Sequence, residues 1–217
     1  MISFKIDEIK STIPKEVTLV AVSKTKPASM IEQGMKNGHL DFGENKVQEL
    51  VEKHDKLPKN IKWHMIGHLQ RNKVKYIVPF VHLIHGVDSE RLLNEINKQG
   101  GKINRKIDCL LQFHIANEST KFGFNIEEVQ EIIDSNKISE WKNINIRGVM
   151  GMATFTNDTN QIKEEFELLQ TNYNLLCEQL SKTTFNILSM GMSGDYSTAI
   201  KCGSNMIRIG SSIFGSR

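Results

Sequence analysis

A lysine stands at the end of an apolar segment near the start of the chain. Residues 17–24 read VTLVAVSK, so a run of strand-forming residues is followed by the primary amine of Lys24. A strand that is apolar on both faces is buried on both sides, which places this amine at the mouth of the core. Partial burial favours the free amine, the form that attacks an aldehyde to give a Schiff base. A simpler interpretation is that the side chain covers the rim while its charged end stays in water.

Two glycine-containing loops near the end of the chain are the second candidate feature. The first reads MGMSGD at 190–195 and includes Ser193, and the second begins with Gly210 and Ser211. Glycine allows close approach of the backbone, and hydroxyls together with backbone N–H groups bind phosphate. Each loop alone also fits an ordinary turn or helix cap, but the two together favour an anion site.

Arg208 lies inside the apolar segment MIRI at 206–209, two residues before the second glycine loop. A guanidinium keeps its charge at any working pH, so a buried one needs partners. One interpretation is a structural ion pair with a carboxylate, and the other is a hydrogen bond to the ring nitrogen of a planar heteroaromatic ligand. Amine, guanidinium and anion loops match the aldehyde, ring nitrogen and phosphate of pyridoxal 5′-phosphate, which we therefore expect as the cofactor.

Other polar residues follow the next two apolar segments. Asn45 and His64 follow or end these segments, so we expect both at the same mouth. Asn45 could contact the cofactor or cap the helix that begins after it, and His64 could line the pocket or be a satisfied rim histidine. Lys26 is expected in solvent or as a secondary phosphate contact. His64 and His68 have the spacing of a helical zinc pair, but Gly67 argues against a helix, so no metal site is expected.

Short apolar segments alternate with amphipathic ones along the whole chain. We predict strands at 17–24, 39–42, 62–66, 82–86, 108–115, 145–150, 186–190 and 205–209. The predicted helices between them are 30–37, 46–54, 73–78, 91–98, 126–134 and a long one at 162–180. Eight βα units in succession favour an α/β fold whose parallel sheet closes into a (β/α)8 barrel, a TIM barrel. An open doubly wound sheet that binds a dinucleotide is the main rival, but its GxGxxG motif is missing.

Smaller signals complete the predicted fold. An extra N-terminal helix before residue 11 could plug the bottom of the barrel with its apolar face. Asn125 with Glu128 resembles a capping box, and Gly38 and Gly100 follow helical patterns where a left-handed residue would close them. The sequence contains no linker rich in Pro, Gly or Ser, so we expect residues 1–217 to form a single domain.

Composition limits the classes of function. The chain has 217 residues, of which 39% are hydrophobic, and a net charge of +3 without a run of basic residues, so nucleic-acid binding is not expected. No segment approaches the roughly 18 apolar residues of a membrane span. The three cysteines lie far apart without a CxxC pair, which indicates neither a disulfide framework nor a zinc site. We therefore expect a cytoplasmic protein that does not bind membranes.

Five motifs carry a family resemblance, in order, over almost the whole chain. They are VAVSKTKP around Lys24, FGENKVQE at 42–49, WHMIGHLQRNK at 63–73, SMGMSGD at 189–195 and IRIGSSIFG at 207–215. Together they resemble the pyridoxal phosphate homeostasis protein family, whose barrel is similar to the N-terminal domain of alanine racemase. Lys46 and Gly86 depart from the family pattern, in which an aromatic residue and a serine are frequent.

The resemblance implies the role of each site residue. It implies a Schiff base between Lys24 and the cofactor, a contact from Arg208 to the pyridine nitrogen, and phosphate contacts from Ser193, Gly210 and Ser211. It also implies intracellular vitamin B6 homeostasis, with the protein buffering the cofactor or delivering it through transient contact with apo-enzymes.

Catalysis is not expected, and no residue is assigned a catalytic role. A permanent cation opposite the ring nitrogen disfavours the protonated pyridinium, so the ring is a weak electron sink. Barrel-type racemases also need an acid/base group from a further C-terminal domain, and this sequence ends seven residues after Gly210. We expect a monomeric cofactor binder. A slow amino-acid racemase of the same cofactor class is the alternative, and a scaffold with a vestigial pocket is a third.

Overall fold

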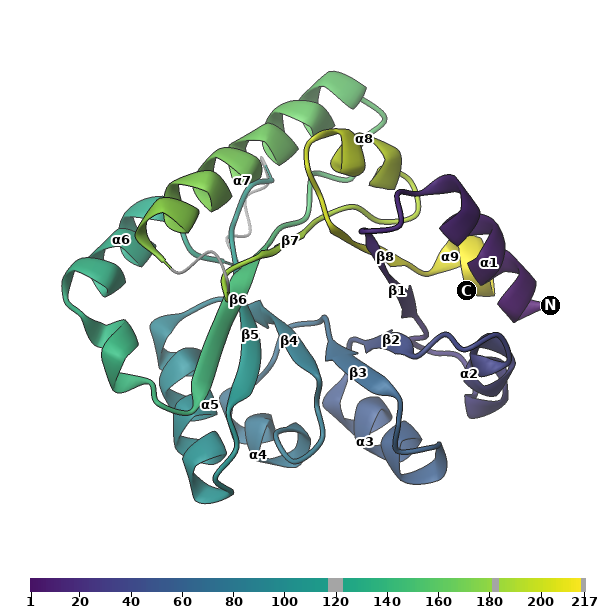
Figure 1. The fold of residues 1–217 in the computed structure, drawn as a ribbon, viewed down its shortest axis with the longest axis horizontal. Coiled ribbons are helices and arrows are strands. Elements are labelled where there is room, and N and C mark those ends of the chain that lie inside the picture. The colour runs from purple at the N-terminus through teal and green to yellow at the C-terminus, as the bar shows by residue number, and fades with distance from the viewer. Residues whose placement is uncertain (117–122, 181–183, 216–217) are drawn as a thin grey trace.

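The computed structural model describes residues 1–116, 123–180 and 184–215, and its centre is a closed barrel of parallel strands in the order β1-β2-β3-β4-β5-β6-β7-β8 (Figure 1). This confirms the predicted (β/α)8 barrel. The strands are β1 (Thr18–Val22), β2 (Asp41–Glu44), β3 (Lys62–Met65), β4 (Leu83–Val87), β5 (Ile107–Gln112), β6 (Ile144–Met150), β7 (Ile187–Ser189) and β8 (Met206–Ile209).

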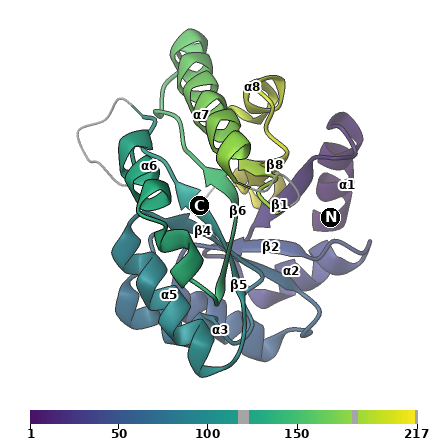
Figure 2. The ribbon, with the colours of Figure 1, turned by 60° about the vertical axis from the view of Figure 1, so that its left-hand side comes forward.

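Helices surround the barrel and cover the outer face of its strands. They are α1 (Ile2–Thr12), α2 (Ala28–Met35), α3 (Val47–Lys56), α4 (Val74–Ile77), α5 (Glu90–Lys102), α6 (Ile126–Asp134), α7 (Thr159–Gln179), α8 (Tyr196–Lys201) and α9 (Ser211–Phe214), with 3₁₀ turns η1 (Arg71–Lys73) and η2 (Lys137–Glu140). The turned view in Figure 2 shows α5, α6 and α7 following one another outside β5 and β6. Within the described ranges, no helix combines the length and the apolar character needed to cross a bilayer.

Strand residues alternate between two hydrophobic clusters. Those that point outward pack under the helices in the larger cluster, which contains Leu19, Trp63 and Met65. The barrel interior holds a small separate cluster of Val20, Leu83, Leu110, Met150 and Met206. Both faces of each strand are therefore buried, which is why the strands read as nearly continuous apolar runs.

The strands pair in a register that fixes which side chains share a level of the barrel. Strand β1 lies between β2 and β8, with Val20 opposite Arg208 and Ala21 opposite both Phe42 and Ile209. Strand β1 ends at Val22, so Lys24 lies two residues beyond it on the carboxyl side. All eight predicted strands are present, with ends that differ by up to three residues.

Two finer predictions are wrong. Helix α1 does not plug the barrel but lies beside α2 and α9 in the outer ring, where its buried face includes Ile6 (Figure 1). Gly100 does not close a helix, because α5 continues to Lys102. A glycine is needed there because a Cβ would lie 2.7 Å from the carbonyl oxygen of Arg105.

The other local signals are confirmed. Asn125 Oδ1 accepts a hydrogen bond from the backbone N–H of Glu128 at 2.7 Å, and Glu128 returns one from its carboxylate to Asn125 N–H at 2.9 Å. Gly38 has a φ of 80°, as expected for the residue that follows α2. The apolar stripe of α7 is buried at Ile162, Phe166, Leu169 and Leu176.

Candidate functional site

The strand register brings most of the predicted site residues to the carboxyl end of the barrel. Arg208 lies opposite Val20 on β1, and a Cβ placed on Gly210 would lie 3.4 Å from that of Val22. Lys24 follows Val22 by two residues at the same rim. It is half-buried, in keeping with an amine at the mouth of the core.

The two glycine loops meet at this rim. The backbone N–H of Gly210 donates to the hydroxyl oxygen of Ser193 at 3.2 Å, and the N–H of Arg208 donates to the carbonyl of Gly191 at 2.9 Å. Gly191 has a φ of 99°, and a Cβ there would lie 2.7 Å from the Cβ of Ala199. The first loop therefore requires glycine at this position so that α8 can pack close to it.

Arg208 is a buried cation whose hydrogen bonds go to neutral groups. The residue is 4% exposed; Nη1 donates to the hydroxyl of Ser189 at 2.7 Å and Nη2 to the carbonyl of Gly151 at 3.0 Å. Among the described residues, none forms an ion pair with it, so the structural ion-pair interpretation is not what the structure shows. Burial lowers the pKa of Arg208 to about 10, although the charge of Asp195 opposes this effect.

A chain of hydrogen bonds leads from Arg208 through the barrel interior. Ser189 Oγ lies 3.3 Å from His85 Nδ1, His85 Nε2 lies 2.9 Å from His64 Nδ1, and His64 Nε2 lies 3.1 Å from Asp41 Oδ1. Arg208 only donates and the Asp41 carboxylate only accepts. With one hydrogen on each imidazole, Ser189 must therefore donate to His85, His85 to His64, and His64 to Asp41. Both rings then carry their hydrogen on Nε2.

The structure places His64 away from the rim where it was expected. Its side chain is fully buried inside the barrel, and both ring nitrogens are occupied by Asp41 and His85. Asp41 is the first residue of β2, so this contact lies toward the amino end of the barrel. His64 can therefore act on a ligand of Arg208 only through the chain, and the pocket-wall hypothesis is replaced by an indirect role.

Asn45 and Lys26 lie in different places on the structure. Asn45 follows β2 at the rim, and the N-cap residue of α3 is Lys46, so Asn45 does not cap that helix. Its backbone is closely packed, since a Cβ on Gly67 would clash with its carbonyl oxygen. Lys26 instead borders a groove beside α3, with Glu49 among the lining residues, and is not on the glycine loops.

A buried ion-pair network below Lys24 was not predicted. Lys53 Nζ donates to Glu44 Oε1 and Glu49 Oε1, both at 2.7 Å, and to the carbonyl of Ser23 at 2.8 Å. The Ser23 hydroxyl also donates to Glu44 Oε1, at 2.6 Å. Burial raises the pKa of Glu44, and the hydrogen bond and charge of Lys53 oppose this rise.

This network holds the backbone on both sides of the candidate lysine. Ser23 is bound as just described, and the N–H of Thr25 donates to Glu49 Oε1 at 2.6 Å. Thr25 has a φ of 66°, a left-handed conformation that is costly for a β-branched residue and persists only when its surroundings enforce it. A sequence signal existed, because Lys53 follows Val47 and Leu50 at the spacing of the buried face of α3.

Comparison with known proteins gives matches that cover most of this chain. The family model described as the alanine racemase N-terminal domain matches residues 2–217. A protein of Pasteurella multocida named pyridoxal phosphate homeostasis protein is 35% identical over 93% of this chain and 87% of its own length. A human protein of the same name is 36% identical over 92% of this chain and 76% of its own length.

Solved structures agree with these matches. PipY of Synechococcus elongatus, whose structure was determined with PLP bound, is 30% identical and superposes with a TM-score of 0.91 over 99% of this chain and all of its own. An alanine racemase of Clostridium difficile has a TM-score of 0.78 at 18% identity and covers all of this chain, which spans 56% of that protein. The racemase comparison shows a common fold.

Proposed function

The chain belongs to the pyridoxal phosphate homeostasis protein family, and on that premise we propose that it binds pyridoxal 5′-phosphate reversibly at the carboxyl end of its barrel. The observation that carries the proposal is the buried Arg208, a cation without a carboxylate partner among the described residues, at the level of the barrel just below Lys24 and the two glycine loops. When bound, the cofactor supplies an aldehyde, an aromatic ring nitrogen and a phosphate.

Each proposed contact follows from the position of a side chain. Lys24 supplies the amine for the aldehyde, and the Glu44, Glu49 and Lys53 network fixes the backbone on either side of it. Arg208 donates to the ring nitrogen. Asn45, at the end of the neighbouring strand, provides a polar wall.

The phosphate is assigned to the glycine loops. Ser193 and Ser211 supply hydroxyls, and Gly210 allows close approach of the backbone. The N–H of Gly210 already points at the Ser193 side chain, so the two loops form one cradle. Positive charge from the buried Arg208 favours an anion nearby.

Arg208 also supports storage of the cofactor over catalysis with it. A guanidinium cannot accept a proton, and its charge disfavours a protonated pyridinium beside it. A ring nitrogen held without its proton withdraws electrons weakly, so carbanion chemistry receives little assistance. We therefore propose that the protein buffers the cofactor or delivers it to apo-enzymes and lacks robust catalysis. Unpaired Cys109, Cys177 and Cys202 fit the reducing cytoplasm.

Spectroscopy tests the assignment of Lys24. Purified protein with pyridoxal 5′-phosphate should show a visible absorption band, and borohydride should fix the cofactor to the peptide that contains Lys24. Lys24→Ala should abolish the band. Lys26→Ala is the matched control, since it removes an amine two residues away that lies outside the proposed site, and it should keep the band. Retention of the band in Lys24→Ala, with trapping on another lysine, would refute the assignment.

A deuterium experiment tests the proposed lack of catalysis. Amino acids incubated with the loaded protein in deuterated water should keep their α-hydrogen. Exchange at enzymatic rates would show that the slow-racemase alternative is correct.

A further inference from the structure

The barrel has a second polar opening at its amino end, opposite Lys24. A cavity of about 440 Å³ lies there and is lined by residues at the starts of the strands, among them Thr18, Asp41, Lys62, Asp108 and Met206. No role for this end follows from the proposed function.

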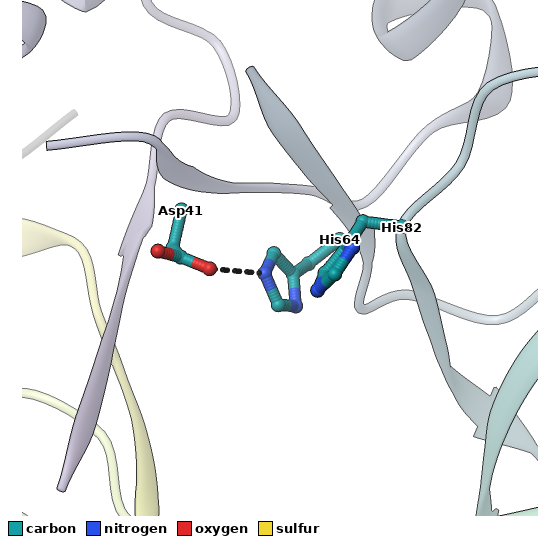
Figure 3. A group of neighbouring side chains, drawn as sticks. All are labelled: Asp41, His64 and His82. Atoms are coloured by element: carbon teal, nitrogen blue, oxygen red, sulfur yellow. Dashed lines mark hydrogen bonds and ion pairs between the residues drawn. The ribbon is translucent and has the colours of Figure 1, made fainter. Parts of the chain in front are cut away.

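Three side chains with metal-binding atoms meet in this cavity. Asp41 begins β2, His64 lies in β3, and His82 comes directly before β4, so neighbouring parallel strands place them at one mouth (Figure 3). One ligand atom from each residue lies within 4.8 Å of the ligand atoms of the other two. Asp41 is half-buried, His64 is buried and His82 is exposed. The three side chains therefore face the cavity, and the buried His64 fixes them to the core.

His64 is oriented by a second buried histidine. Its Nδ1 lies 2.9 Å from Nε2 of His85, which is fully buried and reaches Ser189 on the far side of the barrel at 3.3 Å. The other nitrogen, Nε2, is thereby directed at Asp41 Oδ1, 3.1 Å away. A ligating histidine in a metal protein is normally held in this way through its second nitrogen.

We propose that Asp41, His64 and His82 form a binding site for a divalent transition-metal ion, with Zn²⁺ the best match. Two imidazoles and one carboxylate are a common zinc ligand set, with metal–ligand distances of about 2.0–2.2 Å. Ligand atoms around a tetrahedral ion of that size lie about 3.3–3.6 Å apart. The pair from Asp41 and His64 is already close to this separation, and the exposed His82 meets the His64 ring edge to face, with ring centroids 5.3 Å apart.

The charges around the cavity allow a cation. Asp108 is paired with Arg147 at 2.6 Å, so these two charges compensate each other. Lys62 and Glu16 line the same cavity and carry opposite charges. The carboxylate of Asp41 therefore remains as the negative ligand for the ion, and a water molecule from the cavity can complete the coordination.

Metal binding must reverse the hydrogen bonds inside the barrel. A metal on His64 Nε2 replaces the hydrogen that otherwise goes to Asp41, so the ring carries its hydrogen on Nδ1 and donates it to His85 Nε2. His85 must then carry its own hydrogen on Nδ1 and donate it to the Ser189 hydroxyl oxygen. Both imidazoles thus change from the Nε2–H to the Nδ1–H tautomer without a change in charge.

Cobalt is a suitable spectroscopic probe for the proposed site. Titration of the metal-free protein with Co²⁺ should produce visible d–d absorption of a low-symmetry site, and Zn²⁺ should displace it. His82→Ala should weaken Co²⁺ binding at least tenfold, and it should fold because His82 is exposed. His68→Ala is the matched control, since His68 is also an exposed histidine near a carboxylate, Asp88, and it should bind Co²⁺ like the parent protein.

The experiment has clear negative outcomes. Absence of Co²⁺ absorption at millimolar metal, or equal binding by His82→Ala and the parent protein, overturns the proposal. Nitrogen-15 NMR of the histidine rings adds a second readout, because Zn²⁺ should convert the signals of His64 and His85 from Nε2–H to Nδ1–H. Binding with unchanged tautomers of these two rings would place the metal elsewhere. All measurements use the Lys24→Ala protein as well, so they do not depend on cofactor binding.

Discussion

The buried ion pair between Lys53 and Glu44 should make a large contribution to the free energy of unfolding. Lys53→Met keeps the aliphatic length of the side chain but removes the ammonium and its three hydrogen bonds. The Glu44 side chain is fully buried and that of Lys53 is 8% exposed, so the remaining carboxylate cannot be solvated by water. Removal of one partner from a buried pair costs about 3–5 kcal/mol, and we expect Lys53→Met to lower the free energy of unfolding by this amount.

A double-mutant cycle separates the ion pair from simple loss of packing. Glu44→Gln removes the negative charge and should itself be destabilising, because the buried ammonium of Lys53 then has the partly exposed Glu49 as its only carboxylate partner among the described residues. In the Lys53→Met/Glu44→Gln double variant, the fully buried carboxylate is gone, and the partly exposed Glu49 keeps the N–H of Thr25 as a donor. Part of the loss in Lys53→Met should therefore be recovered, with a coupling energy of about 2 kcal/mol or more.

Urea unfolding, monitored by circular dichroism, measures the free energy of unfolding of each variant. Lys163→Met is the matched control, because Lys163 forms an exposed ion pair with Glu167 at 3.4 Å and should contribute less than about 1 kcal/mol. A cost for Lys53→Met no greater than that for Lys163→Met would refute the inference that the pair is an essential support. In addition, Lys53→Met should release the cofactor faster than Lys163→Met does, since Ser23 loses its partner beside Lys24.

Two further predictions concern charge in the barrel. Arg208→Glu should weaken retention of pyridoxal 5′-phosphate and shift its visible absorption, because a carboxylate would repel the ring nitrogen; equal retention and an unchanged spectrum would contradict the proposed contact. Burial, helped by the charge of Lys10, lowers the pKa of His39 from 6.5 to about 4, so below pH 6.5 the unfolded chain binds a proton that the native protein does not. The free energy of unfolding should therefore fall by about 2 kcal/mol more between pH 7 and pH 5 in the parent protein than in His39→Gln, as measured by urea unfolding at both pH values; equal losses would refute this role of His39.

The fold could be predicted from the sequence because its signals are local. A doubly apolar strand, a glycine turn and an amphipathic helix are each readable over a few residues, and their repetition indicates the barrel. Strand ends were less certain. Gly43 and Glu44 continue β2 beyond the predicted end at Phe42, because pairing with β3 outweighs the low strand propensity of glycine and glutamate.

The candidate site could be predicted at Arg208 and the glycine loops, because residue types suited to the ligand stand there at the ends of predicted strands. His64 could not be placed, because its level in the barrel depends on strand register and on a contact with His85 of the neighbouring strand β4. The role of Lys53 was missed for a similar reason. Its partners come from β2, α3 and the residue after β1, and only the folded chain brings them together.

The directed hydrogen bonds between Arg208 and Asp41 leave the middle of the barrel electrically polarised along its axis. Three neutral groups, Ser189, His85 and His64, all point their hydrogens toward Asp41, between the cation of Arg208 near the rim of Lys24 and the carboxylate toward the opposite mouth. An apolar residue in place of Ser189 or His85 would divide this array into two halves. Each half would then contain a buried polar atom without a partner, so the interior of this barrel is far less tolerant of hydrophobic substitution than its composition suggests.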